Sequence, residues 1–171
     1  MSTLLSPITR RRLDIQGLET VPDEQLAPVA PWLRLAYGLC ATLAAAGTVL
    51  ASPTVLLALV PIAALAAVFP VHPFDLIYNH GIRRLTGTGP LPKRGAPARF
   101  ACGMGAVWLT VTAGLFATGH TIVGYVLGGM MTCVAVLVST TDICLPSMTY
   151  RMLFGWSAPR TRTPTPSAAP R

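Results

Sequence analysis

The sequence predicts an all-α membrane protein in which four transmembrane helices form two antiparallel hairpins, with a cytoplasmic interfacial amphipathic helix between them. Of the 171 residues, 52% are apolar and only 11% are charged, whereas about 25% of the residues in a soluble domain carry charge. Residues 35–74 and 100–141 contain no charge. Each run is roughly twice as long as one transmembrane helix requires. An ordinary soluble domain is therefore excluded.

A turn signal divides each uncharged run into two helices. The first run turns at residues 52–54 (Ser-Pro-Thr) and the second at residues 118–120 (Thr-Gly-His). Pro61 lies inside the second helix and predicts a kink, because neighbouring helices can satisfy the carbonyl that a proline leaves unpaired. The four helices are expected at residues 32–51, 54–71, 99–117 and 121–143.

The basic residues predict the orientation of these helices. All 13 Lys and Arg lie in three segments, with four before residue 35, five in the loop 72–99 and four after residue 143. The two short turns contain none. Cytoplasmic loops carry the excess of Lys and Arg, so both termini and the middle loop are predicted to be cytoplasmic. The membrane domain would cover residues 32–156.

The segments outside this domain are polar. Pro22, Pro28 and Pro31 interrupt any long helix in residues 1–31, so we expect a loosely structured cytoplasmic arm with a short helix near residues 22–26. Residues 157–171 consist of Ser, Ala, Pro, Arg and Thr. This composition buries no core and predicts a disordered tail.

Residues 74–85 have the pattern of a helix that lies in the headgroup plane. Apolar residues recur at steps of three and four, so one face would contact the bilayer and the other its anionic headgroups. Asp75 suits the first turn, where a carboxylate favours the positive end of the helix dipole. Arg83 and Arg84 would face anionic lipid, and the same interfacial position explains His72 and His80. The apolar stripe consists of Phe74, Ile77, Tyr78, Ile82 and Leu85.

Small residues recur on the expected contact faces of two helices. Gly124-x3-Gly128 and Gly38-x3-Thr42-x3-Ala46 are small-x3-small patterns, which let helix backbones approach closely in lipid. They predict either packing within the bundle or a seam with a second copy or another membrane protein.

The cysteines provide the weak redox candidates. Cys144-Leu-Pro-Ser147 resembles a C-x-x-C site with its second thiol replaced by a hydroxyl. A thiol pKa is lowered near a helix N-terminus or a cation, but we expect Cys144 near a helix C-terminus, where only Arg151 and Arg99 could compensate. Cys102 is predicted to pack as a small apolar residue, and it is the alternative partner of Cys144. Neither is assigned a catalytic role.

Several classes of function are not supported by the sequence. His120 is expected on the opposite side of the membrane from His72 and His80, so no metal or other cofactor site is predicted. No helix carries an acidic residue at mid-membrane depth, which argues against an ion-coupled pump. The net charge of +7 is explained by topology signals rather than by nucleic-acid binding.

The third and fourth helices predict one contact by register. Residues at equal depth in this hairpin have numbers that sum to about 239 or 240, given a turn near residue 119. The numbers of Arg99 and Asp142 sum to 241, so the two residues lie at nearly the same level and are predicted to form an ion pair at the cytoplasmic rim. Cys102 and Cys144 are offset by about 9 Å along the axis, which is too far for a disulfide unless the chain bends back near Pro146.

Four blocks of the sequence resemble one uncharacterised family of small bacterial inner-membrane proteins, the domain of unknown function numbered four-three-nine-five. They are HPFDLIYNHGIR (residues 72–83), LP (91–92), RFACG (99–103) and CLP-x3-Y (144–150). The resemblance covers residues 71–154 and implies a four-helix domain of the bacterial inner membrane. Some relatives occur beside thiol- or sulfur-handling proteins, and members often have a second cysteine where this chain has Ser147.

The sequence supports a non-enzymatic partner or scaffold for other envelope components as the leading hypothesis. The alternative is a thiol-redox or sulfur-handling membrane protein that acts through Cys144. A small transporter subunit is the third possibility.

Overall fold

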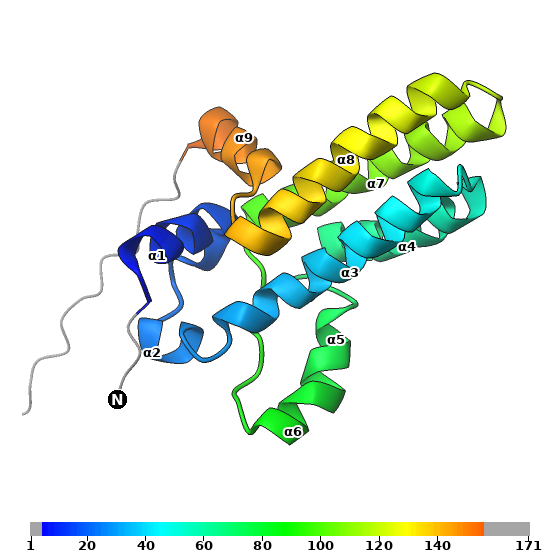
Figure 1. Ribbon diagram of the computed structural model, residues 1–171. Coiled ribbons are helices and arrows are strands. Elements are labelled where there is room, and N and C mark those ends of the chain that lie inside the picture. The colour runs from blue at the N-terminus through cyan, green and yellow to red at the C-terminus, as the bar shows by residue number, and fades with distance from the viewer. Residues whose placement is uncertain (1–4, 156–171) are drawn as a thin grey trace, which may run out of the picture.

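The computed structural model describes residues 5–155, and within this range every regular element is a helix, which confirms the predicted all-α class. The predicted tail lies outside the described residues. In chain order (Figure 1), the helices are α1 (Pro7–Leu13), η1 (Asp14–Leu18), α2 (Asp23–Leu26), α3 (Ala30–Val49), α4 (Pro53–Val68), α5 (Asp75–Ile77), η2 (Tyr78–Ile82), α6 (Arg83–Thr86), α7 (Ala96–Ala117), α8 (Thr121–Thr141) and α9 (Leu145–Phe154).

Among the described residues, three helices are long and apolar enough to cross a membrane. They are α3, α7 and α8, with 20, 22 and 21 residues. The fourth apolar helix, α4, has 16 residues and contains Pro61. It ends before residue 71, the expected end, because Phe69 precedes Pro70 and adopts an extended backbone conformation. Four membrane crossings therefore remain a prediction.

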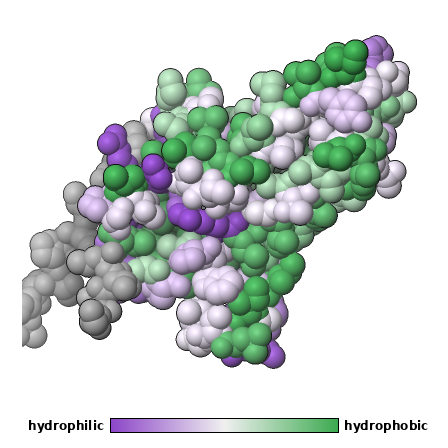
Figure 2. All heavy atoms as spheres, in the orientation of Figure 1, coloured by the Kyte–Doolittle hydropathy of each residue, from purple (hydrophilic) through white to green (hydrophobic). Residues whose placement is uncertain are grey.

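The four long helices pack in pairs. Helix α4 lies against α7 and α3 lies against α8, while α3 also contacts α4 and α7 contacts α8. The turns after α3 and α7 lie at one end of this bundle, and α1, α2, α5 and α9 lie towards the other (Figure 1). We call the latter the polar end. Hydrophobic side chains cover much of the long helices on the face shown in Figure 2. The buried core between the helices consists of Ala44, Leu56, Leu59, Leu109 and Ala113.

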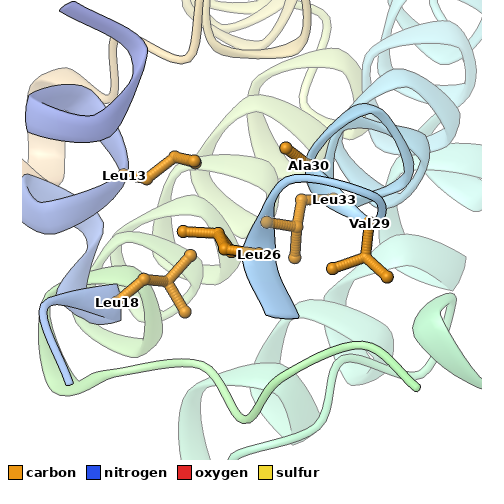
Figure 3. Close-up of a cluster of buried hydrophobic side chains, with 6 residues drawn as sticks. All are labelled: Leu13, Leu18, Leu26, Val29, Ala30 and Leu33. Carbon is orange, nitrogen blue, oxygen red and sulfur yellow. The ribbon is translucent and has the colours of Figure 1, made fainter. Parts of the chain in front are cut away.

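The arm is folded, so the expectation of a loose arm is wrong for residues 5–31, although α2 agrees with the short helix expected near residues 22–26. Leu13, Leu18 and Leu26 are buried and pack against the start of α3 (Figure 3). Gly17 has a φ of 94°, and a Cβ at this position would collide with the backbone of Gly95. The arm is ordered because its leucines cover the polar end of the bundle, a contact that its local sequence pattern does not reveal. The cluster drawn in Figure 3 is Leu13, Leu18, Leu26, Val29, Ala30 and Leu33.

Residues 75–86 form three consecutive short helical segments, α5, η2 and α6. Tyr78 is fully buried, and its ring lies 5.3 Å from that of Trp32. Ile77 and Leu85 are exposed, at 51% and 89%, as a face that contacts lipid would be. The position of this segment at a membrane surface remains a prediction.

Candidate functional site

Three of the four cysteines line one cavity inside the bundle, although they are far apart in the sequence. Cys40 lies in α3, Cys102 lies in α7 and Cys144 immediately precedes α9. The cavity has a volume of about 130 Å³, and His72 and Tyr37 also line it. We call this space, with these five residues, the thiol cavity. Much of the remaining wall is apolar and includes Leu59, Ala63, Leu109, Met131 and Val138.

A sharp turn brings Cys144 to this cavity. Helix α8 ends at Thr141, and Asp142 adopts a left-handed conformation with a φ of 60°. Cys144 is then the N-cap residue of the ten-residue helix α9. Cys144 therefore follows the C-terminus of α8 closely, as expected, but it also lies at the N-terminus of α9, which was not predicted. The register estimate of a 9 Å offset assumed a straight helix through residue 143, so it does not apply to Cys144, and all four cysteines are free thiols.

Ser147 is the immediate polar neighbour of Cys144. Its Oγ lies 3.0 Å from Cys144 Sγ and 3.2 Å from the carbonyl oxygen of Pro97, and its side chain is completely buried. Burial raises the pKa of the Cys144 thiol, whereas the hydroxyl and backbone of Ser147 and the charge of Arg94 act to lower that pKa. The resting thiol is protonated, but the groups that would stabilise its thiolate are already in place.

His72 has a defined tautomer at the cavity wall. The backbone N–H of Phe74 donates to His72 Nδ1 at 3.2 Å, so the ring proton of the neutral imidazole resides on Nε2. Cys40 Sγ lies 4.0 Å from this Nε2. Burial, together with the charge of Arg94, lowers the pKa of His72 to about 4. His72 is therefore neutral and can donate a hydrogen bond towards Cys40, but it cannot act as a base for that thiol.

A buried ion pair between Asp75 and Arg94 lies beside this cavity. Arg94 Nη2 and Nε donate to the two carboxylate oxygens of Asp75 at 2.7 and 2.8 Å. The two side chains are only 3% and 4% exposed. The Arg94 guanidinium also lies over the Tyr37 ring, 4.7 Å from its centroid. The prediction that Asp75 occupies the headgroup face of an interfacial helix is therefore wrong, as is that for His72, which is 2% exposed.

The predicted Arg99–Asp142 ion pair is also wrong. Asp142 pairs with Arg34, whose Nε lies 3.0 and 3.1 Å from the two carboxylate oxygens. Arg99 instead donates from Nε and Nη2 to the carbonyl oxygens of Ala67 and Val68, at 3.0 and 2.5 Å. The left-handed turn directs Asp142 towards α3 and away from α7.

The two glycines of Gly124-x3-Gly128 pack inside the chain. Gly124 is covered by the ring of Phe116, and Gly128 lies against Thr48 in α3. Both are buried, so neither offers an outer face to a second copy. The predicted basic residues of the middle loop, Arg83 and Arg84, are exposed on α6.

Sequence reasoning missed Cys40, Tyr37, Arg34 and Arg94. One signal was available for Arg94, because Asp75 is the only acidic residue between positions 25 and 141 and needs a basic partner if buried. Within residues 5–155, no group of three or more His, Cys, Asp or Glu side chains is arranged to hold a metal ion.

Comparisons with known proteins identify a family but not an activity. No match to a curated protein or to a solved structure was found. Residues 30–154 match the family described as Domain of unknown function (DUF4395), and the chain belongs to that family.

Proposed function

We propose that the chain is a multi-pass protein of the bacterial inner membrane that performs thiol–disulfide exchange in the thiol cavity. The observation that carries this proposal is the convergence of Cys40, Cys102 and Cys144 on one internal space. In the proposed topology, α3, α4, α7 and α8 cross the bilayer as two antiparallel hairpins. Both termini and residues 72–99 are cytoplasmic, and the exposed Arg83 and Arg84 contact anionic headgroups.

Cys144 is the attacking thiol in this proposal. Its position at the N-terminus of α9 and its contact with Ser147 favour a thiolate once the proton has left. Cys102 lines the same cavity and serves as the second thiol. Among residues 5–155, no side chain donates a hydrogen bond to the sulfur of Cys102, so Cys102 is not assigned the role of attacking thiol. The volume of about 130 Å³ suits the sulfur–sulfur bond of a small disulfide rather than a segment of another protein.

The reaction balances as two successive exchanges. The Cys144 thiolate attacks one sulfur of a small disulfide, forms a mixed disulfide and displaces a thiolate that takes up the proton lost by Cys144. The Cys102 thiol then loses its proton and attacks the Cys144 sulfur, which releases the second small thiol. Two protein thiols are oxidised and one disulfide is reduced to two thiols.

Oxidation of the full chain in membranes tests this chemistry. Treatment with hydroxyethyl disulfide, followed by alkylation and peptide mass spectrometry, should yield a Cys102–Cys144 crosslink. Cys144→Ser and Cys102→Ser should abolish the crosslink, whereas Cys133→Ser should retain it, because Cys133 is exposed on α8 outside the cavity. If all cavity thiols stay reduced, the exchange proposal is overturned.

The second candidate is the non-enzymatic scaffold. The raised pKa of Cys144 favours it, because a protonated buried thiol is inert. Exposed apolar side chains on α9, such as Met152 and Leu153 at 85% and 68%, offer a surface for another membrane component. Cavity thiols that stay reduced would support this candidate.

Reporter fusions test the proposed topology independently of the chemistry. Fusions at Ser52 and Thr118 should give a periplasmic signal, and a fusion at Gly89 should give a cytoplasmic signal. A periplasmic signal at Gly89 would overturn the arrangement.

A further inference from the structure

An apolar groove lies on the outside of the bundle and shares two lining residues, Met104 and Trp108, with the thiol cavity. Its volume is about 690 Å³. One stripe of α7 forms its floor at four-residue spacing and consists of Arg99, Gly103, Val107 and Val111. Trp108 also lines it, and its indole N–H donates to the carbonyl oxygen of Leu127 at 3.0 Å.

The middle of the stripe is hollow because Gly103, Val107 and Val111 have small side chains or none. Gly103 has no side chain, and a Cβ there would lie in ordinary contact with Ala67 of α4 at 3.5 Å. Val107 and Val111 are 66% and 48% exposed. Exposed aliphatic residues at this density on a long apolar helix face lipid rather than water.

Arg99 places one positive charge at the polar end of this groove. It is half-buried, and its Nε and Nη2 donate to the last carbonyls of α4. Within residues 5–155, no carboxylate pairs with Arg99, and its Nη1 has no hydrogen-bond partner. The groove therefore combines apolar walls with one uncompensated cation.

We infer that this groove binds one acyl chain of an anionic phospholipid, with Arg99 holding the phosphate of its headgroup. Val111 follows Arg99 by twelve positions, or about 18 Å of helix, which is close to the roughly 15 Å of one hydrocarbon leaflet. This inference rests on the membrane location proposed above, but not on the thiol chemistry.

A second copy of the chain fits this groove less well than a lipid does. The chain has a net charge of +7 and only six acidic residues. Two of these, Asp75 and Asp142, are buried in ion pairs within the chain. The phosphodiester of a phospholipid supplies the negative counter-charge for Arg99, whereas a second copy has few acidic residues to offer.

Quenching of Trp108 fluorescence tests the inference in the full chain. Trp32→Phe and Trp156→Phe leave Trp108 as the only indole, and the protein is reconstituted with chain-brominated phosphatidylglycerol or phosphatidylcholine. Brominated phosphatidylglycerol should quench Trp108 with about fivefold higher apparent affinity, the preference that one interfacial basic residue confers. Arg99→Gln should remove this preference, and Arg99→Lys should keep it.

Two further variants complete the test. Arg11→Gln should retain the preference, because Arg11 is exposed on α1 and does not line the groove. Gly103→Leu should fill the groove and weaken quenching by both lipids while leaving Arg99 intact. Equal quenching by both lipids in the parent protein would overturn the anionic site but leave the membrane location standing. Absence of quenching by either lipid would overturn both.

Discussion

Arg94 and Asp75 form a bidentate ion pair that is almost completely removed from solvent, with N–O distances of 2.7 and 2.8 Å. Nineteen residues separate them, and Arg94 Nη2 also reaches the carbonyl oxygen of Leu33 in α3 at 3.4 Å. The pair therefore links the α4–α7 connection to α3 beside the thiol cavity.

Removal of one member of this pair should destabilise the protein severely. Asp75→Ala leaves the Arg94 charge buried without a counter-ion, which costs about 3–5 kcal/mol. Thermal unfolding in detergent should show a large loss, and the double variant Asp75→Leu/Arg94→Met should recover part of it. Asp23→Ala is the control, because its partner Arg10 and Asp23 itself are partly exposed, and it should change stability by less than about 1 kcal/mol. A small effect of Asp75→Ala would contradict the assigned role of the pair.

Stability should fall between pH 6.5 and pH 4 because of His72. Its pKa is lowered to about 4 by burial and by Arg94, so the unfolded state binds a proton in this range while the folded state does not. The contribution of neutral His72 to the free energy of unfolding is fully present above pH 6.5. It is lost as the pH falls to 4, by an amount of the order of 3 kcal/mol. Unfolding measured at pH 7 and pH 5 should differ less in His72→Gln than in the parent. An equal pH dependence in both proteins would exclude His72 as its source.

A double-mutant cycle should assign the partner of Asp142. Arg34→Ala and Asp142→Ala should show a coupling of about 1 kcal/mol, since Arg34 is 39% exposed and its charge is partly screened. The corresponding cycle between Arg99 and Asp142 should give a coupling near zero. Asp142→Asn should cost less than Asp142→Ala, because asparagine also tolerates a positive φ. If Asp142 were coupled to Arg99 and not to Arg34, the pairing expected from the helix register would be correct.

Gly128→Ala should force α3 and α8 apart. A Cβ at Gly128 would overlap the side chain of Thr48, and overpacking of this kind costs about 1–3 kcal/mol. Gly129→Ala is the matched control on the same helix, because nothing lies within 4 Å of a Cβ there, and it should be neutral or slightly stabilising. Thr48→Ala should rescue Gly128→Ala. Equal effects of the two glycine substitutions would contradict this packing.

The length and apolarity of α3, α7 and α8 could be predicted because they depend on composition along one stretch of chain. The turns at residues 52 and 118 were found for the same reason, since Pro and Gly act locally. Asp142 was paired wrongly because one left-handed residue ends α8 and redirects the chain. Its partner Arg34 lies 108 residues away, a contact that only packing of α3 against α8 creates. Cys40 was overlooked because only the packing of the helices brings it to the same cavity as Cys102 and Cys144.

The arm has a consequence for the order of assembly. Arg12 Nη1 donates to the carbonyl oxygen of Thr141 at 2.8 Å, Gln16 Nε2 donates to that of Asp142 at 2.9 Å, and Arg151 pairs with Glu19 at 2.8 Å. Arg12 and Gln16 thus find their partners only after residue 142 has been synthesised, and Glu19 finds its partner only after residue 151. Docking of the arm onto α8 and α9 is then a late step in biogenesis, and a chain truncated before α9 would leave Glu19 without its partner Arg151.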